Sequence, residues 1–327
     1  MRALRFERFG GPEVLSVVEV ADPEATPDRA VVEIEAASIN PSDVKNVAGA
    51  MEGTVLPRVP GRDFAGRVVD GPEDWIGVEV WGTGGDVGFS IDGSHAERIQ
   101  VPVESLARKP ENLSFDEASV VGVNFIVGWI GAVEIANLSS GESIAVFGVR
   151  GGVGSAVAQI ARARGARVFG VARTAPAEGS PAAQAIEAFV PITEGSADVS
   201  GELRQLTGGR GVDVVYDAVG GVTTPAALAS LARGGRLVVV SAVGRRNVEL
   251  DLIDFYHREL RLLGVDSRKL DLTASSRRLS ALAPYFERGE FRPVSVGHVY
   301  DLDHGPDAYT IVADHASGRV VIHPGRR

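Results

Sequence analysis

The first third of the chain alternates short apolar segments with turns. Between residue 1 and about residue 120, runs rich in β-branched and aromatic residues are separated by clusters of Gly, Pro and Asp. Such runs bounded by turn residues are typical of β-strands, and many of them in succession predict a small barrel or sandwich. This prediction depends on the segments Arg29–Ile34, Gly66–Val69, Val78–Trp81 and Glu97–Val101.

The pattern changes near Ser143, where apolar strand-like runs begin to alternate with helical stretches. Ser143–Gly148 precedes an alanine-rich predicted helix over Val153–Arg164, and Arg167–Ala172 predicts the next strand. Apolar strands that alternate with helices predict a parallel sheet covered on both faces, and therefore an α/β fold. Further strands are expected at Val212–Asp217, Arg236–Ser241 and Leu260–Val265. The tail from about Leu270 contains one amphipathic stretch and two strand-like runs. We expect this tail to fold back onto the N-terminal part.

Composition and charge narrow the function classes. The length of 327 residues suggests about two domains. The 33 basic and 43 acidic residues give a net charge of −10. This negative charge argues against a nucleic-acid or anionic-membrane partner. The chain has no cysteine, which excludes disulfides, thiol nucleophiles and thiolate-bound metals. Ala118–Val133, the longest uncharged stretch, is shorter than the roughly 20 apolar residues that span a bilayer. With no signal-like N-terminus, we expect a cytoplasmic protein.

The strongest local motif is the glycine-rich turn at Gly148–Gly154, which follows a predicted strand and precedes a predicted helix. Glycine permits a tight turn and a close approach of the backbone to a pyrophosphate, and the amides at the helix N-terminus stabilise the phosphates. A crowded strand–helix junction can also demand glycine for structural reasons alone. The position inside a run of strand–helix units nevertheless favours dinucleotide binding.

The end of the next predicted strand indicates which dinucleotide binds. NAD sites usually place Asp or Glu there to accept from the ribose hydroxyls, whereas this chain has Arg173 and Thr174 and no carboxylate before Glu178. An arginine suits the 2′-phosphate of NADPH, which an acidic residue would repel. We therefore expect NADPH, with a solvated charge at the strand end as the alternative role of Arg173.

Taken together, the motifs extend over nearly the whole chain. They are Ala37–Asp43 (ASINPSD), Leu56–Gly66 (LPRVPGRDFAG), Gly93–Glu97 (GSHAE), Gly148–Gly154 (GVRGGVG), Gly208–Gly221 (GGRGVDVVYDAVGG) and Gly318–Ile322 (GRVVI). In this order they resemble the zinc-independent, ζ-crystallin-like quinone oxidoreductases of the medium-chain dehydrogenase/reductase superfamily. The resemblance implies a GroES-like β-rich barrel domain over residues 1–122 and 268–327, and a Rossmann NADPH-binding domain over residues 123–267.

The zinc-bearing relatives bind their metal with Cys, His and Glu, and the matching positions of this chain differ. No cysteine lies near Asn40, and Arg62 and Asp63 stand where those relatives have a His–Glu pair. We therefore expect no metal site. Alcohol oxidation would then lack a metal to hold the alkoxide, whereas a quinone or an α,β-unsaturated carbonyl accepts hydride without one. This reasoning predicts NADPH-dependent reduction of a small-molecule quinone or enone.

The resemblance also implies site residues. Asn40 is expected beside nicotinamide and substrate, with Lys45 and Trp129 as further catalytic or pocket residues; Lys45 could instead pair with Asp43 or face solvent. Val127 is expected among the cofactor-binding residues, near the nicotinamide ribose, where many relatives have a threonine hydroxyl that Val127 lacks. Thr193 stands where a tyrosine often flanks the adenosine. Arg150 either adds charge near the phosphates or projects outward. The remaining cofactor contacts are expected from Gly151, Gly152, Val153, Arg173, Thr174, Ala218, Val219, Ser241, Ala242, Val243, Val265, Ser267 and Arg319, with strand-end packing as the alternative for residues 218–219 and 241–243.

Two other function classes share these cofactor residues. One is a reductase of an enal, enone or enoyl thioester, and the other is a non-catalytic NADPH-binding protein. By analogy with the same family we expect a homodimer that associates through an edge strand of the parallel sheet, either Arg236–Ser241 or Leu260–Val265.

Overall fold

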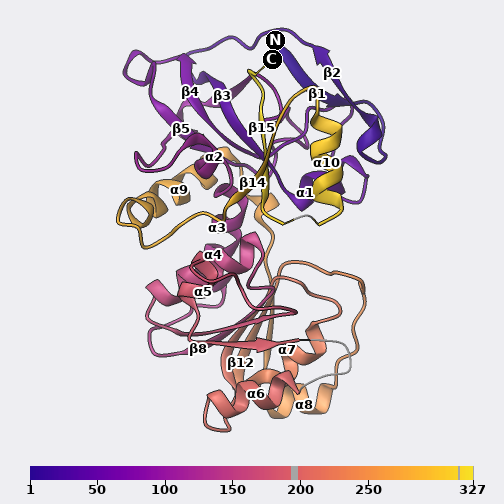
Figure 1. Cartoon of the computed structure of the whole chain (residues 1–327), viewed down its shortest axis with the longest axis vertical. Coiled ribbons are helices and arrows are strands. Elements are labelled where there is room, and N and C mark those ends of the chain that lie inside the picture. Colours follow the sequence, from indigo (N-terminus) through magenta and orange to yellow (C-terminus); the bar gives the residue numbers. More distant parts are fainter. Residues whose placement is uncertain (193–197, 316, 327) are drawn as a thin grey trace. The chain divides into compact units, whose positions relative to one another are not determined.

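The computed structural model describes residues 1–192, 198–315 and 317–326. The chain divides into two compact units, and we describe each by itself. Unit 1 comprises residues 1–126, 267–289 and 293–327, and unit 2 comprises residues 127–266 and 290–292. The predicted α/β fold class is confirmed, with a β-rich unit and a parallel-sheet unit (Figure 1).

The strands of unit 1 pair mostly antiparallel, and only β14 and β15 pair in parallel among the described strands of this unit. Its main sheet has the order β14-β15-β3-β4-β5-β7, β6 pairs with β3, and β1 and β2 form a separate two-stranded sheet. The strands are β1 (Arg2–Phe6), β2 (Leu15–Glu19), β3 (Arg29–Ile39), β4 (Asp63–Asp70), β5 (Glu79–Gly82), β6 (Arg98–Pro102), β7 (Ala107–Arg108), β14 (Val296–Asp301) and β15 (Arg319–His323). The helices are η1 (Pro12–Val14), α1 (Pro41–Val47), η2 (Glu73–Trp75), η3 (Val103–Ser105), α2 (Phe115–Ser119), η5 (Ser267–Lys269), α9 (Leu272–Glu287) and α10 (Gly305–Ala313).

The alternation of residues along β3 shows why this strand lies at the centre of unit 1. Val32 and Ile34 are buried and pack in one apolar cluster with Phe64 of β4, whereas Glu33 and Glu35 between and after them are exposed. Successive side chains of a strand point to opposite faces, so the alternation assigns one face of β3 to the core. The C-terminal β15 pairs with the end of β3, which completes the sheet with a segment distant in sequence.

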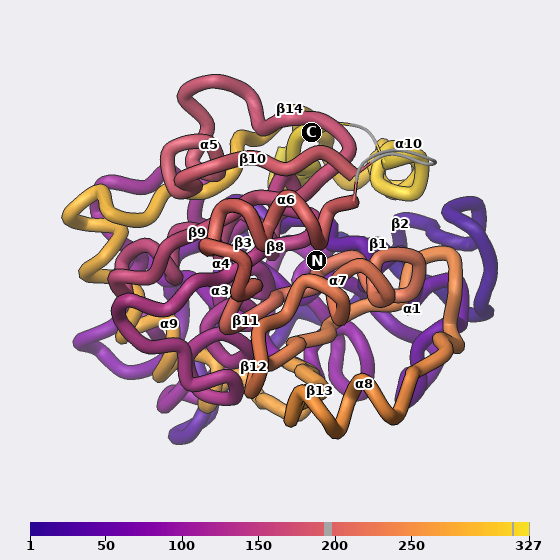
Figure 2. Tube along the Cα trace, turned by 90° about the horizontal axis from the view of Figure 1, so that it is seen from below, coloured from indigo at the N-terminus to yellow at the C-terminus, as the bar shows by residue number. Residues whose placement is uncertain are grey.

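Unit 2 is a doubly wound parallel sheet in the order β10-β9-β8-β11-β12-β13, and Figure 2 shows the six strands in that succession. Apolar residues of β8 alternate between two cores. Ile144 and Val146 pack with α4 and α5, while Ala145 and Phe147 pack with α6 and α7. The elements are α3 (Gly122–Trp129), which begins in unit 1, a π-helix (Ile130–Ile135), β8 (Ser143–Phe147), α4 (Gly152–Ala163), β9 (Arg167–Ala172), α5 (Pro181–Ala185), β10 (Ala188–Pro191), α6 (Val199–Leu206), β11 (Val212–Asp217), α7 (Thr224–Ser230), β12 (Leu231–Val239), α8 (Leu252–His257) and β13 (Arg261–Gly264).

Some boundaries differ from the sequence prediction. β12 begins at Leu231 and ends at Val239, so Ser241 lies in the following loop rather than in the strand. The apolar stretch 118–133 forms short helical segments, and most of its side chains are buried. Across the described ranges, no helix is both long and apolar enough to span a bilayer.

His95 has a structural role inside unit 1. The ring is fully buried, with Nε2 3.3 Å from the carbonyl oxygen of Ser38 and Nδ1 3.0 Å from the hydroxyl of Tyr309. Because a carbonyl can only accept, Nε2 carries the proton and Tyr309 donates to Nδ1. Burial disfavours the charged ring and lowers the pKa of His95 to about 4.

We expect His95 to make unit 1 less stable as the pH falls. Between its usual pKa of about 6.5 and the folded value of about 4, only the unfolded chain takes up the proton. The replacement His95→Gln can keep both hydrogen bonds but cannot titrate. Urea denaturation measures the free energy of unfolding of both proteins. The difference between the native protein and this variant should change by about 2 kcal/mol between pH 7 and pH 4.5, to the disadvantage of the native protein. Because both proteins are measured at each pH, the contributions of the other titrating groups cancel in the difference. A difference in the free energy of unfolding that did not change with pH would contradict a neutral, buried His95.

Candidate functional site

The glycine-rich turn joins β8 to α4 in unit 2. Gly148 has a left-handed φ of +77°, which favours glycine. A Cβ on Gly154 would lie 2.2 Å from the carbonyl oxygen of Gly148, so only glycine lets the helix pack this closely on the turn. Gly151 is the N-cap of α4, and no side chain within the described residues caps it. The amides of the first helical turn, which include those of Gly152 and Val153, are therefore left for water or an anionic ligand.

The carboxyl ends of β8, β11 and β12 bring the other predicted cofactor residues beside this turn. The Ala218 N–H donates to Phe147 O at 3.1 Å, and the Val243 N–H donates to Val219 O at 3.1 Å. A Cβ on Gly148 would lie 2.9 Å from Val219, and one on Gly220 would lie 1.7 Å from the carbonyl oxygen of Ser241. In this strand order the direction of winding reverses between β8 and β11, which is where open parallel sheets bind ligands.

Asp217 holds the loop after β11 in place, a role that no motif in the sequence indicates. The carboxylate is fully buried. Its Oδ1 accepts from the Gly220 N–H at 2.8 Å and from the Thr223 hydroxyl at 2.7 Å, and its Oδ2 accepts from the Thr224 hydroxyl at 3.2 Å. A carboxylate that accepts from several loop donors sets the path of the backbone, so Asp217 shapes the segment that carries Ala218 and Val219.

Arg173 and Thr174 follow β9, and both are exposed. Arg150 of the glycine-rich turn donates from a guanidinium nitrogen to the Thr174 hydroxyl. In the described parts of the chain no carboxylate pairs with Arg150 or Arg173. The structure thus brings to the end of β9 two arginines that have no carboxylate partner among the described residues.

Asn40 lies at the centre of a buried polar cluster in unit 1. It follows β3 as the N-cap of α1. Its side-chain Nδ2 donates to Asp63 Oδ2 at 3.0 Å, and its Oδ1 accepts from Arg319 at 2.6 Å. The backbone N–H of Asn40 donates to Asp43 Oδ2 at 2.7 Å. These partners determine the orientation of the amide, because Arg319 can only donate and a carboxylate accepts.

Burial dominates the electrostatics of this cluster. The pKa of Asp43 rises to about 7, first because its carboxyl is removed from water and further because the charge of Asp63 is close, although the Asn40 N–H opposes the rise. Burial also lowers the pKa of the Arg319 guanidinium, and Asp63 and Asp43 act against that decrease. The second carboxylate, Asp63, accepts from the Val123 N–H at 3.1 Å as well as from Asn40.

The residues around Asn40 and Asp63, including the neighbouring Arg62, do not fit a catalytic zinc. Arg62 is buried, with its Nε donating to Gly84 O at 2.8 Å and another guanidinium nitrogen 3.2 Å from the Ser267 hydroxyl. A guanidinium cannot ligate a metal. In the part of the chain that the structure describes, no group of three or more His, Cys, Asp or Glu side chains could hold a metal ion.

The other predicted site residues each have their own contacts or exposure, and one of them lies outside the described residues. Lys45 is exposed on α1, and no ion pair joins it to Asp43 among the described residues. Trp129 is half-buried in unit 2, and the Val127 carbonyl accepts from the buried Tyr216 hydroxyl at 2.9 Å. Val265 donates its N–H to Val239 O at 3.1 Å. Thr193 lies outside the described residues.

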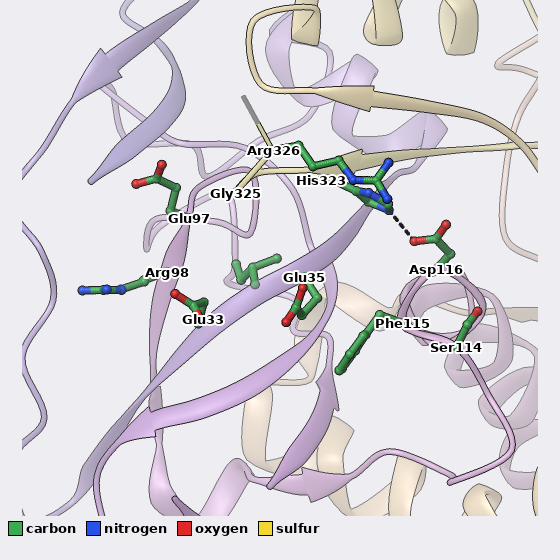
Figure 3. Close-up of a pocket in the computed structure, with 11 residues that line it drawn as sticks. Glu33, Glu35, Glu97, Arg98, Ser114, Phe115, Asp116, His323, Gly325 and Arg326 are labelled. Carbon is green, nitrogen blue, oxygen red and sulfur yellow. Dashed lines mark hydrogen bonds and ion pairs between the residues drawn. The ribbon is translucent and has the colours of Figure 1, made fainter. Parts of the chain in front are cut away.

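A separate hollow of about 760 Å³ lies on unit 1 (Figure 3). It runs along the exposed side of β3 at Glu33 and Glu35, and the His323 ring pairs with Asp116 at its edge. None of the predicted site residues lines it; the lining residues are Glu33, Ile34, Glu35, Glu97, Arg98, Ser114, Phe115, Asp116, His323, Gly325 and Arg326.

Comparisons with known proteins match both units. The family described as alcohol dehydrogenase GroES-like domain matches residues 26–111, and the family described as zinc-binding dehydrogenase matches residues 152–281. The chain is 36% identical over 299 residues to a zinc-type alcohol dehydrogenase-like protein of Schizosaccharomyces pombe, with 89% of this chain and 87% of that protein covered. It is 28% identical over 320 residues to the quinone oxidoreductase of Homo sapiens, with 97% and 95% covered.

Two further similarities bear on the chemistry and the fold. The chain is 30% identical over 347 residues to a 2-methylene-furan-3-one reductase of Solanum lycopersicum, with 99% of this chain and 79% of that protein covered. A solved structure of an NAD-dependent alcohol dehydrogenase superposes with a TM-score of 0.87 at 29% identity, with 99% of this chain and 100% of that one covered.

Proposed function

Because this chain is an oxidoreductase of the medium-chain dehydrogenase/reductase superfamily, we propose that it uses NADPH to reduce a quinone by hydride transfer without a metal. One observation carries the choice of acceptor. Where the zinc-bearing relatives have metal ligands, Asn40 is hydrogen-bonded to Asp63 and Arg319, and Arg62, the residue before Asp63, is a buried guanidinium that donates to Gly84 O. An alcohol would need a Lewis acid to stabilise its alkoxide. A quinone delocalises the negative charge itself, and only hydrogen bonding and orientation are asked of the protein.

NADPH would be held by unit 2. The first-turn amides of α4 would bind the pyrophosphate, and Arg173 with Thr174 would bind the adenosine 2′-phosphate. The loops after β11 and β12, at Val219 and Ser241–Val243, would line the path toward the nicotinamide. When bound, NADPH supplies the hydride.

Asn40 would supply a hydrogen bond to the acceptor. Its Oδ1 is occupied by Arg319 and one Nδ2–H is taken by Asp63. An amide nitrogen has two hydrogens, so the second Nδ2–H remains to donate to the acceptor oxygen, where negative charge develops during reduction. The two charged partners restrain the amide from flipping, which would present an acceptor instead of a donor.

A second candidate is reduction of an enone or enal, which the likeness to the Solanum lycopersicum reductase favours. The same Nδ2–H would then stabilise an enolate oxygen. The two candidates differ in the compound that is reduced, not in the cofactor residues.

Steady-state NADPH oxidation tests the proposal. We expect turnover with 1,4-benzoquinone and 9,10-phenanthrenequinone, little turnover with 2-alkenals, and no loss of activity after dialysis against a metal chelator. Turnover with 2-alkenals alone would establish the second candidate. If NADPH binds and no acceptor raises its oxidation above background, the chain is a non-catalytic NADPH-binding protein. Inactivation by the chelator, reversed by zinc, would contradict a metal-free mechanism.

We also propose that two copies associate through β13. This strand ends the parallel sheet, so one of its backbone edges lacks a partner strand within the sheet. Leu262 of β13 and Leu252, Ile253 and Tyr256 of α8 are exposed apolar residues. A second copy related by a twofold axis would pair the open edges and cover these side chains. The alternative edge, at Arg236–Ser241, is wrong because β12 pairs with β11 on one side and β13 on the other.

Leu262→Arg is expected to convert the proposed dimer into a monomer. Leu262 is 51% exposed in the single chain, and two arginines brought together across the twofold axis would repel each other. Light scattering coupled to size-exclusion chromatography measures the mass. Ile76→Arg changes a residue of similar exposure, 49%, in unit 1 and should leave the mass unchanged. A native protein that elutes as a monomer would refute the association.

A further inference from the structure

Arg150 projects from the glycine-rich turn toward the end of β9. The turn is attached to that strand, because the N–H groups of Gly148 and Val149 both donate to Val171 O, at 2.8 and 3.4 Å. From this anchored backbone the Arg150 guanidinium donates to the Thr174 hydroxyl oxygen. The guanidinium is therefore directed to the residue beside Arg173.

The contact leaves donors unused. A threonine hydroxyl has one hydrogen, and its oxygen here accepts from Arg150, so the hydrogen remains to donate elsewhere. Arg150 also keeps the other N–H groups of its guanidinium. Arg150, Arg173 and Thr174 are all exposed. Together they present two positive charges and a hydroxyl donor, with no carboxylate bound to either arginine among the described residues.

We propose that Arg150 is a second arginine of the adenosine 2′-phosphate site and, with Arg173 and Thr174, determines the choice of NADPH over NADH. This inference rests on the proposed NADPH-dependent function. A phosphomonoester carries between one and two negative charges at neutral pH and three strong acceptor oxygens. Two guanidinium groups and a hydroxyl complement such a group, and like charges held close together are favourable when an anion lies between them.

The direction of the side chain distinguishes this role from pyrophosphate binding. The pyrophosphate would lie on the first-turn amides of α4, which begins at Gly152. Arg150 instead reaches Thr174, two residues beyond the end of β9 at Ala172. In this fold the end of that strand is where the adenosine ribose is recognised.

Calorimetric titration of two nucleotides tests the proposal without catalysis. The probes are 2′,5′-ADP, which has the 2′-phosphate, and 5′-ADP, which has a diphosphate and a free 2′-hydroxyl. We expect Arg150→Ala to weaken 2′,5′-ADP at least about tenfold, the loss typical of a charge-assisted hydrogen bond, and 5′-ADP less than about twofold. Arg150→Lys should lose part of this affinity, because lysine keeps the charge without the planar donors. Arg164→Ala removes an exposed arginine at the other end of α4 and should change neither affinity.

Each other result overturns the proposal in a distinct way. If Arg150→Ala weakened the binding of both nucleotides equally, Arg150 would belong to the pyrophosphate site. If it weakened the binding of neither, Arg150 would be a solvated side chain. If the unmodified protein bound NADH as tightly as NADPH, the NADPH preference itself would be wrong. If it bound neither nucleotide and no NADPH, the proposed function would fail together with this inference. Thermal melting of each variant checks that it is folded.

Discussion

Replacing Arg173 by glutamate is expected to weaken NADPH binding by about 100-fold or more and NADH binding by no more than about threefold. The replacement removes a charge-assisted pair with the 2′-phosphate and puts a negative charge in its place. NADH has a hydroxyl at that position, and a carboxylate can accept from ribose hydroxyls. The variant should therefore change the coenzyme preference rather than abolish binding.

Fluorescence titration of the reduced coenzymes measures both dissociation constants. Arg173 is exposed, so the change should leave the melting temperature nearly unaltered. Arg164→Glu, the same charge reversal at an exposed arginine beyond α4, controls for long-range electrostatics. Equal weakening of NADPH and NADH by Arg173→Glu would show that Arg173 does not bind the 2′-phosphate.

Replacing Asn40 by aspartate is expected to lower kcat for quinone reduction by about 100-fold at pH 8, the loss typical when one stabilising donor is removed. The new carboxylate would have no hydrogen to offer to the acceptor. It would also face Asp63, the present partner of the Asn40 amide, and lie near Asp43. Burial and those two carboxylates disfavour a further negative charge and should raise the pKa of the new group, although the Arg319 guanidinium beside it opposes the rise.

The pH profile distinguishes a donor from a structural role. As the pH falls, the aspartate of the variant should become protonated and donate again, so its kcat should recover relative to that of the native protein. Asn40→Ala, which cannot donate at any pH, should show no such recovery. If both variants lost the same activity at every pH, Asn40 would act only by holding the cluster together. NADPH affinity, measured in parallel, should stay within about threefold for both.

Strong local patterns allowed the prediction of much of unit 2. The alternation of apolar strands and helices predicted the parallel sheet, and β11 covers the same residues, Val212–Asp217, as its predicted strand. The glycine-rich turn lies between β8 and α4 as expected. The sequence did not identify β1, β2 or β10, because each is a short strand whose pairing partner, not its own composition, makes it a strand.

The sequence by itself determined what depends on residue type and near neighbours. It indicated the α/β class and the glycine-rich turn between a strand and a helix, and it shows no cysteine and, at Arg62 and Asp63, no His–Glu pair. It also supported the resemblance to a superfamily to which the chain belongs. These features can be read from the chain because helix and strand periodicity, turn chemistry and ligand type are local properties.

Only the tertiary structure decided which side chains meet. Asn40 lies 23 residues from Asp63 and 279 residues from Arg319, and all three join in one hydrogen-bonded cluster. Arg150 could point to the phosphates or outward, and its bond to Thr174, 24 residues away, resolves its direction. Such partners follow from strand order and burial rather than from spacing, because a buried polar group binds whatever complementary group the fold brings to it.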